Sequence, residues 1–120
     1  MKRFLVLPAM ALALSLSSPL TVHAEGNDYP TAERVQFVEE CMADYPDKGR
    51  FEMVHKCSCV IDQLAAHYTL DEYVDMTTAA KAFTISGERG NVVRDTPMGK
   101  RLNTQYKQAI AASKDACFLK

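Results

Sequence analysis

The sequence has no excess of charge of either sign, because 14 basic and 15 acidic residues give a formal net charge of −1. A nucleic-acid-binding domain needs a basic face or stripe, so we expect no nucleic acid as a partner. After residue 24 the chain also lacks an apolar run near the roughly 20 residues that a bilayer-spanning helix needs. We therefore expect no membrane insertion of the mature protein.

Motifs that carry catalysis or cofactors are missing as well. The chain contains no Gly-rich phosphate loop, no His-Glu-x-x-His, no Gly-x-Ser-x-Gly and no Cys-x-x-Cys-His. These absences argue against hydrolysis at a nucleophile elbow, zinc proteolysis and covalent haem. We expect a protein that is no enzyme and holds neither a cofactor nor a metal.

The first 24 residues have the three parts of a secretory signal peptide. Lys2 and Arg3 form a basic start, residues 4–16 form the apolar segment, and Val22-His23-Ala24 fits a small-residue cleavage site. Its removal leaves residues 25–120 with 12 basic and 15 acidic residues, a net charge of −3. We predict one periplasmic domain of this size, because 96 residues are too few for two.

Four cysteines, Cys41, Cys57, Cys59 and Cys117, are the most informative residues of the mature chain. An even number of cysteines in a short secreted chain is typical of a disulfide framework. Cys57 and Cys59 are separated by about 200° on a helix, so they cannot readily bond to each other. Two pairings remain, and we favour Cys41–Cys57 with Cys59–Cys117.

Hydrophobic spacing and capping signals predict an all-α domain of about four helices in a small bundle stapled by two disulfides. The predicted helices span residues 31–44, 51–68, 70–83 and from 97 onward, with Thr31, Thr69 and Thr96 as N-caps. Residues 25–29 are expected to form a flexible leader. Residues 85–95 are expected to form a long loop.

Each predicted helix has an expected buried stripe. The expected inward positions are Val35, Val38, Cys41 and Met42 in the first; Met53, Cys57, Val60, Ile61, Leu64 and Tyr68 in the second; Leu70, Tyr73, Val74, Thr77, Ala80 and Lys81 in the third; and Leu102, Tyr106, Ile110, Ser113 and Cys117 in the last.

The Cys57-Ser58-Cys59 pair also has a functional interpretation. Beside His55 it could bind copper or zinc or exchange thiols, with Met42, Met53 and Met76 as soft ligands for Cu(I). The usual metal spacing is absent and the methionines fall on expected core stripes, so structural disulfides are favoured. His55 and His67 are interpreted as partly exposed surface residues.

The segment from Gly87 to Asp95 is the candidate binding loop. Its two glycines permit backbone conformations that other residues avoid, and its charged residues could either order the loop or present a recognition surface. The candidate contact residues are Glu88, Arg89, Asn91, Arg94 and Asp95. Both the structural and the binding interpretation stay open at this point.

Several short runs resemble those of a family of small, largely uncharacterised periplasmic proteins of proteobacteria. They are Lys56-Cys57-Ser58-Cys59-Val60-Ile61-Asp62, Asp71-Glu72-Tyr73-Val74, Gly87-Glu88-Arg89-Gly90, Arg94-Asp95 and Ala116-Cys117-Phe118. The similarity covers nearly the whole mature chain. The resemblance implies an accessory role beside periplasmic oxidation systems such as quinoprotein dehydrogenases, and it brings no established activity with it.

We therefore predict a periplasmic protein that acts by binding another periplasmic protein, as an accessory or an inhibitor, without catalysis. One alternative is an immunity protein that blocks a periplasmic toxin through the Gly87–Asp95 loop. Another alternative is a thiol-redox or copper-binding protein that uses Cys57 and Cys59.

Overall fold

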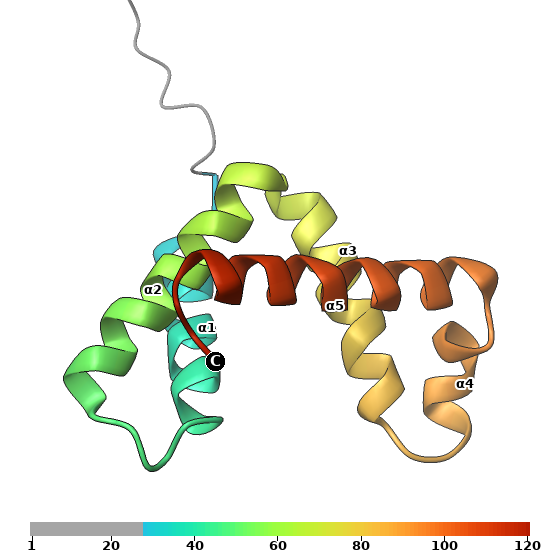
Figure 1. The fold of residues 1–120 in the computed structure, drawn as a ribbon. Coiled ribbons are helices and arrows are strands. Elements are labelled where there is room, and N and C mark those ends of the chain that lie inside the picture. The colour runs from blue at the N-terminus through green and yellow to red at the C-terminus, as the bar shows by residue number, and fades with distance from the viewer. Residues whose placement is uncertain (1–27) are drawn as a thin grey trace, which may run out of the picture.

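The computed structural model describes residues 28–120, and this part of the chain is all-helical (Figure 1). Its helices are α1 (Thr31–Ala43), α2 (Arg50–His67), α3 (Leu70–Thr84), α4 (Glu88–Arg94) and α5 (Pro97–Ala116). The expectation of about four helices was too low by one, because α4 forms where a loop was predicted. The predicted signal peptide, residues 1–24, lies outside the described residues.

Two helical hairpins pack against α5. The first hairpin packs α1 against α2 and the second packs α3 against α4, while α5 runs across α2, α3 and α4 (Figure 1). No helix in residues 28–120 has both the length and the hydropathy that a bilayer crossing requires.

Helix starts follow local capping chemistry at two of the three predicted positions. The Thr69 hydroxyl accepts a hydrogen bond from the Glu72 backbone N–H, and the Glu72 carboxylate accepts one from the Thr69 N–H, which completes a capping box. The Thr96 hydroxyl accepts from the Gly99 N–H at 2.9 Å. The prediction for Thr31 was wrong: Pro30 is the N-cap, and no side chain caps α1.

The core is centred on α2. Its fully enclosed residues match the predicted stripe, with Tyr68 half-buried at its end; the buried members are Met53, Cys57, Val60, Ile61 and Leu64. On α1 the prediction was partly wrong, because Phe37 is buried beside Cys41 whereas Val35 is 51% exposed. The two buried residues lie four positions apart and therefore on one face of the helix.

The predicted face of α3 was also rotated from the observed one. The buried residues are Tyr73, Met76, Ala79 and Ala82, whereas Val74 and Lys81 are exposed. All four recur at a spacing of three residues and two are alanines, so this face packs closely on its neighbours without a strong hydrophobic signal. A stripe of small residues is easily missed from sequence.

The segment before α1 is held in place at the α2–α3 junction. Tyr29 is 4% exposed, its hydroxyl donates to the Tyr68 carbonyl at 3.2 Å, and its ring lies 5.0 Å from that of Tyr73. The Asp28 carboxylate accepts a hydrogen bond from the Leu70 N–H. Assigning Tyr29 to a flexible leader was therefore wrong.

Two disulfides tie α2 to its neighbours. Cys41 bonds to Cys57, which links α1 to α2, and Cys59 bonds to Cys117, which links α2 to the residue that ends α5. This is the pairing that the sequence analysis favoured. Disulfides of this kind are typical of proteins in an oxidising compartment outside the cytoplasm.

Candidate functional site

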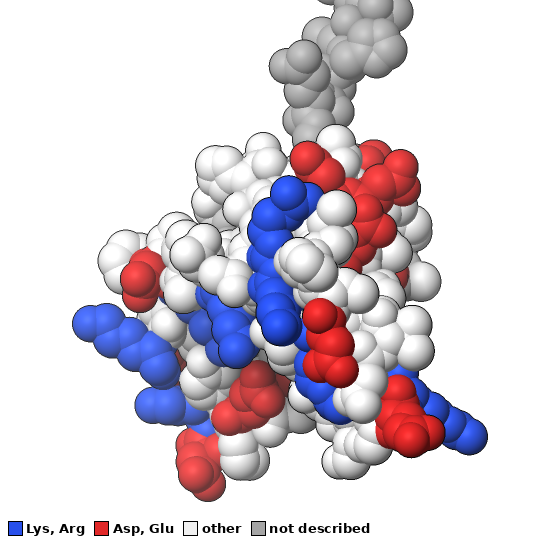
Figure 2. All heavy atoms as spheres, turned by 90° about the vertical axis from the view of Figure 1, so that its right-hand side faces the viewer, with Lys and Arg blue, Asp and Glu red and all other residues white. Residues whose placement is uncertain are grey.

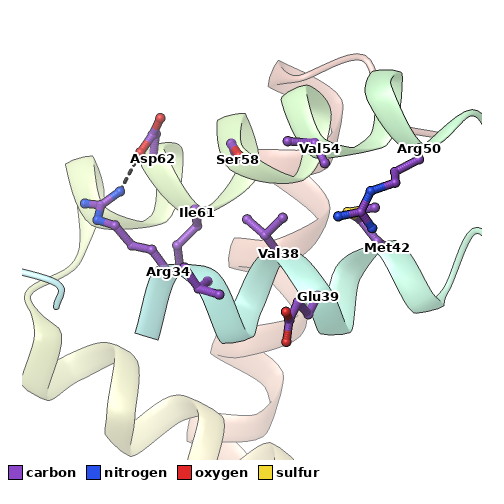
Figure 3. A pocket seen from close by; sticks show the side chains of 10 residues that line it. Arg34, Val38, Glu39, Met42, Arg50, Val54, Ser58, Ile61 and Asp62 are labelled. Atoms are coloured by element: carbon purple, nitrogen blue, oxygen red, sulfur yellow. Dashed lines mark hydrogen bonds and ion pairs between the residues drawn. The ribbon is translucent and has the colours of Figure 1, made fainter. Parts of the chain in front are cut away.

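A groove of about 640 Å³ lies between α1 and α2 (Figure 3). It runs along the outer face of this hairpin. Its floor is apolar, with Val38 pointing toward α2 and Ile61 pointing toward α1 (Figure 3). The lining residues are Arg34, Val35, Val38, Glu39, Met42, Arg50, Val54, Ser58, Ile61 and Asp62.

One end of the groove is closed by an ion pair between the two helices. The Arg34 guanidinium donates to the Asp62 carboxylate at 2.5 Å (Figure 3). The same guanidinium donates through Nε to the Tyr29 carbonyl at 3.4 Å and lies 5.7 Å from the centre of the Tyr29 ring. Arg34 therefore joins α1 to α2 and to the segment before α1, and its charge is compensated within the protein.

The other end carries charges that the fold does not compensate. Arg50, the first residue of α2, extends its guanidinium toward Met42 of α1, and Glu39 lies on the side of α1 away from α2 (Figure 3). Within residues 28–120, neither Glu39 nor Arg50 has an ion-pair or hydrogen-bond partner. The groove thus offers one free cation and one free carboxylate on opposite rims.

Sequence reasoning missed this groove because it assigned all of Val35, Val38 and Met42 to the core, whereas Val35 is exposed and Val38 and Met42, which pack partly against the core, also line the groove. The available signal was a second apolar stripe on α1: Val35, Val38 and Met42 follow helical spacing on one face, while Phe37 and Cys41 follow it on another. A helix with two apolar faces has more hydrophobic surface than one core contact uses. Such a helix indicates a second surface to be covered.

The predicted binding loop is instead helix α4 with its flanking turns. Arg94 binds inward: its guanidinium donates to the carbonyls of Ile85 (2.6 Å) and Gly87 (3.1 Å) and to the side-chain oxygen of Asn91. Glu88, Arg89 and Asp95 are exposed. Arg94 and Asn91 therefore hold this segment together by hydrogen bonds, whereas no ion pair of the expected kind is found in residues 85–95.

The face that carries α4 and the start of α5 shows both charge signs interspersed (Figure 2). This mixture gives the face no single-sign field of the kind that steers a highly charged partner. The immunity-protein alternative, which placed its contact on the Gly87–Asp95 segment, stays a prediction.

All four cysteines are paired, and three of them are buried. A metal-binding or thiol-exchange role needs a thiolate, so Cys57 and Cys59 would serve it only after both bridges opened. Among the described residues, no group of three or more His, Cys, Asp or Glu side chains is placed to hold a metal ion. Met53 and Met76 are buried in the core, apart from the groove residue Met42.

The two histidines of the described part lie on the surface, as expected. His55 and His67 are exposed, and the His55 ring meets the ring of the exposed Phe51 edge-on at 4.6 Å. Neither histidine lines the groove.

A smaller cleft of about 200 Å³ lies between α1, α3 and α5. Tyr73 and Tyr106 line it together with Glu33, Glu40 and Lys81. Burial is the main cause that raises the pKa of both tyrosines, and the nearby glutamates raise it further. The two phenols therefore stay protonated at neutral pH.

Comparisons of this chain with protein-family models, with curated proteins and with solved structures gave no match. The resemblance to small periplasmic proteins therefore stays a prediction. The α1–α2 groove is the feature on which a functional proposal rests.

Proposed function

We propose that this chain is a secreted, periplasmic binding protein that receives a segment of another protein in the α1–α2 groove and performs no catalysis. The observation that carries the proposal is the apolar lining of the groove, which the fold leaves partly open to solvent: Val38, Met42 and Val54 are only half-buried. Val35 illustrates this, since it is 51% exposed on a helix whose opposite side is buried. Contiguous apolar surface of this kind marks interaction sites.

The surroundings of the groove indicate a binding site that is already formed before the partner binds. The Cys41–Cys57 disulfide joins the two helices that form its walls, and the Arg34–Asp62 ion pair fixes one end. A rigid site loses little conformational entropy when it is occupied, which favours affinity. Accessory and inhibitor proteins of this size commonly work through one such surface, and the accessory role implied by the resemblance needs no more.

The test uses two exposed valines as a matched pair. A photocrosslinking amino acid is introduced at Val35, in the groove, or at Val92 on α4, which is 78% exposed and lies outside it. In the native cells we expect a discrete protein adduct only from position 35, identified by mass spectrometry.

The partner is then purified and its dissociation constant measured. We expect Val35→Glu to weaken binding about tenfold or more, equivalent to about 1.4 kcal/mol, and Val92→Glu to leave it unchanged. Equal adducts from both positions, or equal effects of both substitutions, would show that the groove is not the binding site.

A further inference from the structure

The walls of the groove limit what kind of protein segment can lie in it. Both walls are helices whose backbone groups are already hydrogen-bonded, so an extended strand would find no free edge to pair with. None of the lining residues is aromatic, whereas polyproline segments dock on aromatic rings. A helix satisfies its own backbone groups and can meet an apolar floor without leaving polar atoms unpaired.

The dimensions fit a short helix. α1 has 13 residues and is about 20 Å long, and its groove residues from Val35 to Met42 span about 10 Å of that length. An amphipathic helix covers this distance with apolar residues at i, i+4 and i+7. Three such side chains match the spacing of Val35, Val38 and Met42 along the floor.

The two uncompensated charges determine which charged side chains a bound helix should carry and where they should lie. Arg50 lies at the open end of the groove, and Glu39 lies about one turn along α1 from Met42, on the opposite rim. A cation at the first residue of a helix is electrostatically unfavourable for that helix, so Arg50 does not serve the stability of α2. A carboxylate brought in by a partner would compensate it.

We infer that the occupant is an amphipathic α-helix of a partner protein, with apolar residues at i, i+4 and i+7, an acidic side chain beside Arg50 and a basic side chain beside Glu39. This inference rests on the proposed function. An amphiphile with one charged head group, such as a long-chain fatty acid, fits less well. Its carboxylate would compensate the charge of Arg50 but would leave the Glu39 carboxylate on the other rim without a partner.

The test selects the occupant's chemistry without knowledge of the natural partner. A displayed library of 16-residue peptides is selected against the disulfide-bonded mature protein, with counter-selection against its Val35→Glu variant. Selected peptides are synthesised and their dissociation constants measured by fluorescence anisotropy. We expect peptides that become helical on binding and share an acidic residue at a fixed distance from three apolar anchors.

A charge exchange then locates the acidic residue. Arg50→Glu should weaken binding about tenfold, and replacing the conserved acid of the peptide with Lys should restore most of that loss. Arg89→Glu on α4 is the matched control and should change nothing, because Arg89 is an exposed arginine outside the groove. Circular dichroism of each variant confirms that it is folded.

The possible negative results distinguish the helix inference from the proposed function. Groove-dependent peptides that are not helical, or that bind Arg50→Glu as tightly as the original protein, overturn the helix inference and leave the groove as a protein-binding site. Recovery of no groove-dependent peptide overturns both. Displacement of the selected peptides by palmitate, with an affinity that exceeds theirs and depends on Arg50, assigns the groove to a lipid and overturns both as well.

Discussion

Gly90 is the residue on which the contact between α3 and α4 depends. It is buried, and a Cβ atom at this position would lie 2.7 Å from the Ile85 carbonyl oxygen and 2.8 Å from that of Ala82. Both carbonyls belong to the end of α3, and Arg94 donates to one of them. The glycine thus allows α4 to approach the end of α3 closely enough for Arg94 to bind the Ile85 carbonyl.

We predict that Gly90→Ala lowers the free energy of unfolding by about 1–3 kcal/mol, because two of the clashing atoms are backbone atoms that cannot turn away. Gly49→Ala is the control. A Cβ there meets nothing within 4 Å, and a small loss of capping opposes a small gain in unfolded-state entropy, so we expect a change within about 0.5 kcal/mol. Urea denaturation of both variants measures the difference. Equal effects would show that stability does not depend on the close contact at Gly90.

At the scale of single elements, the three threonines that precede or begin helices have different roles. Thr69 and Thr96 each accept a hydrogen bond from a backbone N–H in the first turn of α3 and α5. Thr31 is already inside α1, because Pro30 occupies the N-cap position with φ of −59° and ψ of 150°. Its hydroxyl makes no cap hydrogen bond.

Replacing each threonine with alanine should therefore separate the three sites. We expect Thr69→Ala and Thr96→Ala to lower the free energy of unfolding by about 1 kcal/mol each, through loss of the cap. Thr31→Ala should change it by less than about 0.5 kcal/mol, since alanine is the better helix former. Thermal or urea unfolding gives all three values, and a loss at Thr31 as large as at Thr69 would contradict the assignment.

The helices that sequence predicted well are those with strong local signals. The start of α3 has a complete capping box, and the start of α5 has threonine followed by proline, so both were placed to the residue. α4 was missed because its seven residues contain glycine and are too few to be stable alone. Contacts with α3, which the sequence does not reveal, supply its stability.

The candidate site was harder to predict than the fold. Helix geometry excluded a bond between Cys57 and Cys59 and left two pairings, of which the structure shows the favoured one. The groove, in contrast, depends on which of two apolar faces of α1 turns toward the core. Local spacing gives both faces a similar signal, and only the packing of α1 against α2 decides between them.

At the scale of the whole molecule, three tyrosines from distant parts of the chain make the stability of the fold depend on pH in the alkaline range. Burial is the largest cause that raises the pKa values of Tyr29, Tyr73 and Tyr106 above the ordinary tyrosine value of 10.0. Nearby acidic residues raise them further. Tyr29 precedes α1, while the other two lie on α3 and α5. Their phenols are therefore neutral in the folded protein at a pH where the unfolded chain ionises.

The sign follows from proton binding. Above a pH of about 10 the unfolded state loses phenolic protons that the folded state keeps, so the free energy of unfolding falls as the pH rises. Below that pH these three groups contribute no pH dependence. We expect urea unfolding midpoints to be unaffected by them up to about pH 9 and to decline above pH 10.

The control for this alkaline loss is Tyr73→Phe, which removes one ionisable phenol from the core and should make the decline shallower. Ultraviolet absorbance of tyrosinate should report ionisation together with unfolding. Ionisation of all the tyrosines near pH 10 in a protein that stays folded would contradict the prediction.

The two disulfides also decide how the chain responds to a cut. The bridges close two covalent rings, residues 41–57 and residues 59–117, and Ser58 is the only link between them. A single cleavage inside either ring opens that ring but releases no fragment. Only a cut next to Ser58 would divide the molecule into its two rings, and Ser58 lies in the middle of the 18-residue α2, half-buried among the residues that line the groove. The single joint between the two rings thus lies inside a helix and not in an exposed loop, where proteolytic cleavage is concentrated.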